Sequence, residues 1–139
     1  MKGSGMYSVV ATLIPLILLC ETITTQEEKK PDENDINTPI ITTGYDNISF
    51  VVNAYSFSAN YNEVIDFKAN TVLIDLYIED HESGTGSIYL INGSDEQLVD
   101  YFTSDRKIEG YIYIISPQSI KISLNKFSGK ITFRMSKNS

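Results

Sequence analysis

Alternation of apolar and polar residues with a period of two is the feature that most limits how this chain can fold. The alternation is clearest in residues 71–79 and recurs in residues 119–124 and 130–136. Successive side chains of a β-strand point to opposite faces, so this pattern predicts strands with one buried and one solvated face. The apolar positions are Val72, Ile74, Leu76, Ile78, Ile120, Ile122, Leu124, Ile131, Phe133 and Met135.

The rest of the chain after Pro39 has the same character, with β-branched and aromatic residues separated by turn signals. Many short strands of this kind predict an all-β, antiparallel fold of about eight or nine strands, without a helix, over residues 40–139. Asn92-Gly93 predicts a tight hairpin turn, and a slip of the apolar phase near Asn53-Ala54 predicts a bulge or a bend. The predicted strands are 40–43, 49–58, 62–68, 71–79, 87–92, 97–102, 108–115, 119–124 and 130–136.

This strand pattern is similar to that of jelly-roll and immunoglobulin-like β-sandwiches. The segment lacks the Cys and Trp of true immunoglobulin domains. The resemblance is one of architecture, which does not specify a function.

Residues 1–20 differ from the rest, since one Lys precedes an apolar stretch from Met6 to Leu19. The stretch is shorter than the roughly 20 residues that cross a bilayer, but it has the length of a signal-peptide core. Cys20 at its end resembles the lipid-attachment cysteine of a bacterial lipoprotein signal. Leu19 occupies a position where that family usually has Gly, Ala or Ser. The alternatives are cleavage near residues 22–25, with secretion, or an uncleaved membrane anchor.

Residues 21–39 are polar and acidic, with six carboxylates and two Lys. A segment with so few apolar side chains buries too little surface to offset its ordering entropy. We therefore predict a disordered linker between the N-terminal segment and a domain at residues 40–139.

Charge and cysteine content exclude several functions. The net charge is −7 and no block is strongly basic, which argues against a nucleic-acid partner. Cys20 is the only cysteine and His81 the only histidine, so the domain cannot use Cys–His chemistry. No nucleophile elbow or phosphate-binding loop is found. We predict a non-catalytic protein without a cofactor.

Residues 79–86, Glu-Asp-His-Glu-Ser-Gly-Thr-Gly, are predicted to form a loop after the clearest strand. Glu79, Asp80 and Glu82 are weak candidates for Ca²⁺ ligands, because hard cations prefer carboxylate oxygens. The spacing does not match a known calcium loop, and acidic hairpin loops are commonly only solvated.

The remaining candidates for binding are tyrosines. Tyr77, Tyr111 and Tyr113 alternate with predicted core residues, which places them on the outer face of a sheet. Aromatic side chains on such a face can stack on a glycan or contact a peptide, although tyrosine is also common in strands for packing alone.

We therefore expect an exported, membrane-anchored protein of the cell envelope that binds a glycan, a peptide or a protein. The alternatives are an accessory subunit of an envelope assembly and, less favoured, a small hydrolase that uses carboxylates.

Overall fold

The computed structural model describes residues 35–113 and 116–138, and within them the regular structure consists of six strands in one antiparallel sheet. The predicted all-β antiparallel class is confirmed, and the described residues contain no helix. Consequently no helix in this part of the chain could cross a membrane. The strands are β1 (Ile40–Thr43), β2 (Asn47–Val64), β3 (Thr71–Asn92), β4 (Asp95–Phe102), β5 (Arg106–Tyr113) and β6 (Ser119–Lys137).

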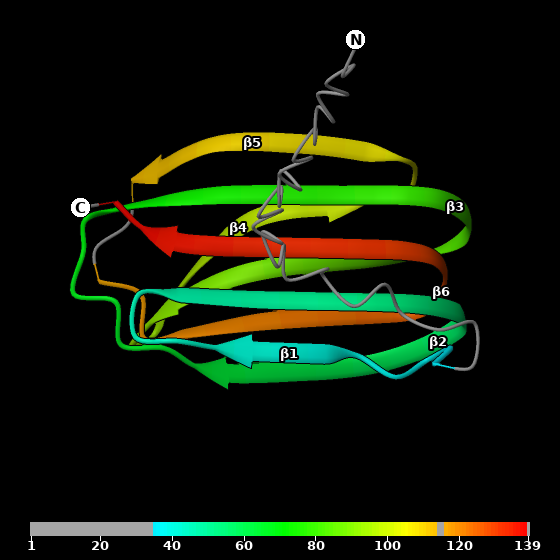
Figure 1. The fold of residues 1–139 in the computed structure, drawn as a ribbon, viewed down its shortest axis with the longest axis horizontal. Helices are drawn as coiled ribbons and strands as arrows, with labels where there is room; N and C mark the ends of the chain where they lie inside the picture. The colour runs from blue at the N-terminus through cyan, green and yellow to red at the C-terminus, as the bar shows by residue number, and fades with distance from the viewer. Residues whose placement is uncertain (1–34, 114–115, 139) are drawn as a thin grey trace, which may run out of the picture. The chain divides into compact units, whose positions relative to one another are not determined.

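The sheet has the order β1-β2-β6-β3-β4, and β5 pairs with β3 (Figure 1). The predicted signal segment 1–20 with Cys20, and residues 21–34 of the predicted linker, lie outside the described residues. Residues 35–39 are described and contact β2. Ile36 forms a bridge with Asn53, and the Asn37 side chain hydrogen-bonds both backbone groups of Tyr55.

The described residues form six strands where eight or nine were predicted, because three pairs of predicted segments are continuous. The segments between them bend but remain in the ladder, as the pairs Ser83–Ser128 and Thr85–Asn125 show. The prediction of a loop at residues 79–86 was therefore wrong. The merged pairs are 49–58 with 62–64 in β2, 71–79 with 87–92 in β3, and 119–124 with 130–136 in β6. Since β2 ends at Val64, residues 65–68 of the predicted strand 62–68 are not strand.

The three long strands bend together, and Figure 1 shows them turning back at the same end of the molecule. The register shifts between Ala54 and Ala59 in β2, where the bulge was predicted, and between Glu79 and Thr85 in β3. Backbone conformations with positive φ gather at these bends, because a strand must leave the extended region to turn. They belong to Ser56, Asp80, Gly84, Lys126 and Gly129.

The bends fold the sheet over, so that its two halves face each other. Phe50 and Tyr61 lie on the same strand, and their ring centroids are 5.3 Å apart. Eleven residues of straight strand would separate them by about 36 Å. The first half contains β1, β5, residues 47–54 of β2, residues 71–79 of β3 and residues 130–137 of β6. The second half contains β4, residues 57–64 of β2, residues 83–92 of β3 and residues 119–127 of β6.

The inward side chains of both halves form one hydrophobic core. The predicted inward positions in 71–79, 119–124 and 130–136 are all buried, which confirms the phase of these strands. Phe102 of β4 and Phe127 of β6 meet edge to face, with centroids 5.7 Å apart. Edge-to-face contact is a favoured geometry for aromatic rings and adds to the gain from burial.

The chain crosses between the halves from β4 to β5, and two polar contacts hold this crossing. Arg106 Nη1 lies 2.7 Å from Oδ1 of Asp100, whose side chain is almost fully buried. The backbone N–H of His81, at the bend of β3, donates to Asp105 Oδ1 over 2.7 Å. A buried carboxylate is tolerated only with such a partner, so Arg106 fixes the start of β5 beside β4.

The predicted Asn92-Gly93 hairpin joins β3 to β4. Asn92 pairs with Asp95, so the turn has two residues, Gly93 and Ser94. Gly93 has φ +61°, a conformation that glycine adopts without a steric cost, and its N–H donates to Gln118 Oε1 over 3.1 Å.

Candidate functional site

A groove of about 390 Å³ lies on the outer face of the second half of the sheet. Strand alternation directs its polar side chains outward, because their neighbours Ile88, Ile122 and Phe102 are buried in the core. None of the described lining residues is charged. The polar lining residues are Ser58, Asn60, Thr85, Ser87, Tyr101, Ser123 and Asn125, and we call this surface the polar groove.

Four of these side chains form a continuous row across the strands. Asn60 of β2 is paired with Ser123 of β6, Ser123 with Ser87 of β3, and Ser87 with Tyr101 of β4. Tyr101 is 53% exposed at the end of the row. Neighbouring strands lie about 4.8 Å apart, so three spacings give the row a length of about 14 Å.

The row has unused hydrogen-bonding capacity. Within the described residues, the side chains of Asn60, Ser87, Ser123 and Tyr101 have no hydrogen-bond partner. Each hydroxyl can donate and accept, and the amide can do both at once. The row can therefore bind a ligand that carries both donors and acceptors.

The outer face of the first half is different, because several of its charged side chains are paired with neighbours. The Tyr77 hydroxyl donates to Glu109, and Lys107 Nζ lies 3.1 Å from Glu109 Oε1. Lys130 Nζ lies 2.6 Å from Asp80 Oδ2. These groups satisfy each other, so this face offers a ligand less than the polar groove does.

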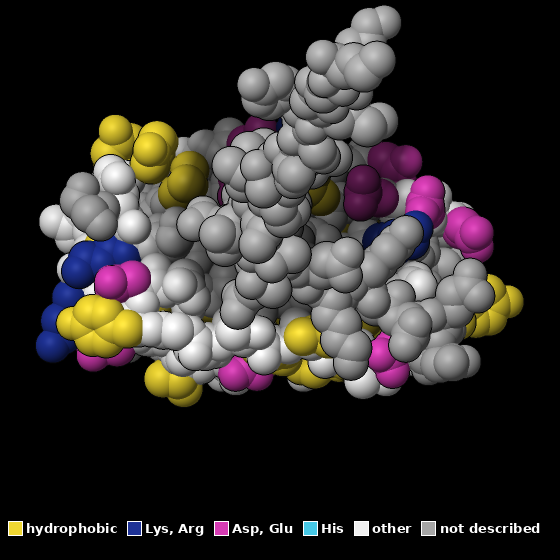
Figure 2. Space-filling model, in the orientation of Figure 1, with side chains coloured by type: hydrophobic (Ala, Val, Ile, Leu, Met, Phe, Trp, Pro, Cys, Tyr) yellow, Lys and Arg dark blue, Asp and Glu magenta, His cyan; other side chains and the backbone are white. Residues whose placement is uncertain are grey.

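The structure separates the three tyrosines that the sequence predicted as a binding face. Tyr113 and Tyr111 lie opposite Thr71 and Leu73, at one end of β5, and are 80% and 59% exposed. Figure 2 shows hydrophobic side chains gathered over this end of β5. Tyr77 lies opposite Lys107, four residues from Leu73 along β3, which is about 13 Å.

Both the ring and the hydroxyl of Tyr77 already have partners within the protein. Lys107 Nζ lies 5.4 Å from the centroid of its ring, in addition to the hydrogen bond from its hydroxyl to Glu109. That hydrogen bond raises the pKa of Tyr77 above 10.0 and, together with Lys107, lowers the pKa of Glu109 below 4.5.

We expect the Glu109→Gln variant to show a lower pKa at Tyr77, closer to 10.0, because the charged acceptor that favours the neutral phenol is removed. A ¹³C NMR titration of the tyrosine ring carbons would measure the shift. In the native protein the stabilisation from the raised Tyr77 pKa holds below pH 10.0 and is lost as the pH rises through the raised value. An unchanged Tyr77 pKa in the variant would contradict the assignment.

The acidic residues predicted as weak metal candidates do not converge. Asp80 is paired with Lys130, and Glu79 lies opposite Lys130 in the ladder. His81 places Nε2 3.0 Å from the Gly84 carbonyl oxygen and its ring 5.5 Å from that of Phe127. Among residues 35–113 and 116–138, no three His, Cys, Asp or Glu side chains form a group that could hold a metal ion.

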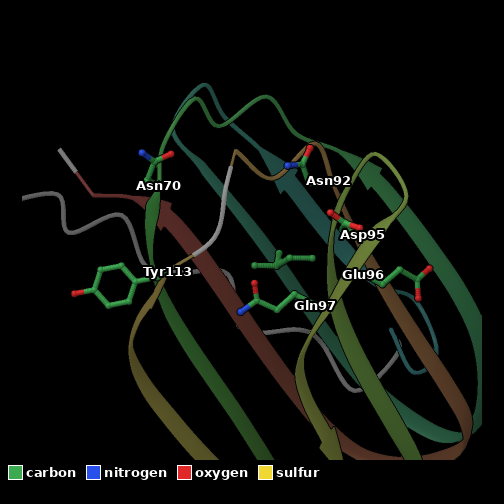
Figure 3. A pocket seen from close by; sticks show the side chains of 7 residues that line it. Asn70, Asn92, Asp95, Glu96, Gln97 and Tyr113 are labelled. Atoms are coloured by element: carbon green, nitrogen blue, oxygen red, sulfur yellow. The ribbon is translucent and has the colours of Figure 1, made fainter.

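A second concavity, of about 540 Å³, lies at the end of the strands near the β3–β4 turn. Figure 3 shows Gln97 and Asp95 on one side of this cleft and Tyr113 and Asn70 on the other. Residues 114–115, which follow Tyr113 in the chain, lie outside the described residues.

The polar groove was missed in the sequence because its residues come from four strands. Serine and asparagine at outward positions are common in any strand, and only the register brings these four into one row. Tyr101 in the predicted strand 97–102 was the one available signal.

No protein-family model matches the chain, and no curated protein matches it. The geometry of the polar groove is therefore the basis for a functional conclusion.

Proposed function

We propose that this protein is an exported, non-catalytic binding protein of the cell envelope, anchored through lipid on Cys20, and that the polar groove binds a glycan. The folded-over sheet then serves as a small β-sandwich of jelly-roll or immunoglobulin-like type, held away from the membrane by the linker.

The observation that carries the proposal is the uncharged row that ends at Tyr101, whose side chains form no hydrogen bond with the described part of the chain. A sugar presents many hydroxyls, which donate and accept, and an apolar ring face that can stack on an aromatic side chain. The row supplies both kinds of contact on a rigid sheet, so little ordering entropy is lost on binding.

We expect a glycan array to identify a ligand, and the Tyr101→Ala variant to bind it about tenfold more weakly, a loss of about 1.4 kcal/mol. The stacking surface is lost in this variant, whereas Tyr101→Phe retains it. Tyr111→Ala is the matched control, since Tyr111 is 59% exposed and also lies on a strand with one partner. Isothermal titration calorimetry would measure all four proteins.

The control also locates the site. Loss of binding in Tyr111→Ala with normal binding in Tyr101→Ala would contradict the polar groove and assign the ligand to β5. Absence of any glycan ligand would contradict the proposed function.

An accessory subunit of an envelope assembly is the second candidate, and the end of β5 favours it. Within the described residues β5 pairs only with β3, so its other edge has no strand partner in this part of the chain, and an edge of this kind can accept a strand from a partner protein. Tyr111 and Tyr113 are exposed beside that edge. Co-purification of a stoichiometric protein partner, with no glycan ligand, would support this role.

A further inference from the structure

The row in the polar groove runs from one edge of the sheet half to the other. Asn60 lies on residues 57–64 of β2, which pair only with β6 among the described residues. Tyr101 lies on β4, which pairs only with β3 in the same part of the chain. Among the described lining residues, no strand stands beyond Asn60 or Tyr101 to close the groove. A ligand longer than the row can therefore pass over both edges.

The electrostatic surroundings favour an uncharged ligand. The lining residues that the structure describes carry no charge. In the adjacent row Lys121 Nζ lies 3.6 Å from Glu96 Oε1 and 5.7 Å from the centroid of the Tyr89 ring, and Lys126 follows the lining residue Asn125 in the chain. An anionic polymer would need a row of cations along its length, and the described lining residues supply none.

We propose that the polar groove binds an internal stretch of a linear, uncharged polysaccharide that crosses the strands from Asn60 to Tyr101. This inference rests on the proposed glycan-binding function and adds the ligand class and its direction. The central serines, Ser123 and Ser87, hydrogen-bond the sugar hydroxyls, and Tyr101 stacks on one sugar ring. A site for a chain end would need a wall at one end of the row, and a peptide would satisfy its backbone better along a free strand edge.

Because the proposed polysaccharide runs along the row from Asn60 to Tyr101, its affinity should depend on its length. We would titrate the full chain with uncharged oligosaccharides, from disaccharide to octasaccharide, of the cello, xylo, manno and β-1,3-gluco series. In the series that binds, affinity should rise with each added unit until the oligosaccharide spans the row and then level off. Added salt should leave the affinity unchanged, because no ion pair forms.

Two central substitutions test the contacts directly. The Ser87→Val and Ser123→Val variants remove a hydroxyl at outward strand positions that accept a β-branched residue. Each should lower the affinity for the longest oligosaccharide about tenfold. Ser136→Val is the matched control, since Ser136 lies on the same strand, β6, in the first half of the sheet. Thermal unfolding of each variant would show that the fold is retained.

The possible outcomes separate this inference from the proposed function. Equal affinity for a disaccharide and an octasaccharide, or a requirement for a free chain end, would overturn the internal-stretch inference while leaving glycan binding intact. Length-dependent binding that is insensitive to both serine variants would overturn the site. No binding to any oligosaccharide, with none on a glycan array, would overturn the proposed function itself.

Discussion

The Gly84→Ala variant should lose about 3 kcal/mol of unfolding free energy, because two costs coincide at this position. Gly84 has φ +79°, in the left-handed region that costs a residue with a Cβ about 1–2 kcal/mol. A Cβ there would also lie 2.2 Å from the carbonyl oxygen of Lys126 and 2.6 Å from that of Asn125. Both atoms belong to the backbone of β6, so neither can rotate away as a side chain could.

Gly93→Ala is the matched control for this prediction. Gly93 has φ +61°, but a Cβ at this position would meet no atom within 4 Å. Only the backbone cost remains, and we expect a loss of about 1 kcal/mol. Denaturation in urea would compare the two variants with the native protein. Equal losses in the two would mean that β3 and β6 do not approach as closely at the bend as the structure has them.

The Phe127→Ala variant should lose about 3–5 kcal/mol, the usual range for truncating a fully buried aromatic residue. Phe127 is 0% exposed and lies next to the bend of β6. Its ring contacts that of Phe102 from β4 and that of His81 from the bend of β3. Truncation would leave a cavity where the two halves of the sheet meet, and the surrounding strands cannot collapse into it without breaking the ladder.

Tyr55→Ala serves as its control, since Tyr55 is 68% exposed on β2, and the loss there should be about 0.5 kcal/mol or less. Phe127→Leu keeps most of the buried volume and should fall between the two. Guanidinium denaturation would measure all three variants. A Phe127→Ala protein as stable as Tyr55→Ala would show that this ring is not part of the core.

The two predictions depend on the bend, which the sequence did not reveal. The bulge at Asn53-Ala54 was visible because the apolar phase slips there, and the structure confirms it near Ser56. The corresponding bend at residues 79–86 was predicted as a loop, since acids, Ser and Gly are typical of hairpin loops. It remains a strand because β6 bends beside it and pairs with Ser83 and Thr85.

The candidate site was less predictable than the fold. The phase of Tyr77 and Tyr111 was derived from local alternation, but alternation does not say whether Glu109 or Lys107 lies beside them. The strand register places Tyr77 beside the charged pair Lys107 and Glu109. It also places Tyr101 in line with Ser87 and Ser123.

The sequence by itself determined the all-β antiparallel class and the buried face of the segments 71–79, 119–124 and 130–136, because a period of two is a local property of the chain. The tertiary structure alone decided that three strands are continuous through their bends, that the two halves share one core, and that Asn60, Ser123, Ser87 and Tyr101 form one row. Pairing partners lie far apart along the chain, and their register is set by how the whole core packs, so no local pattern specifies it.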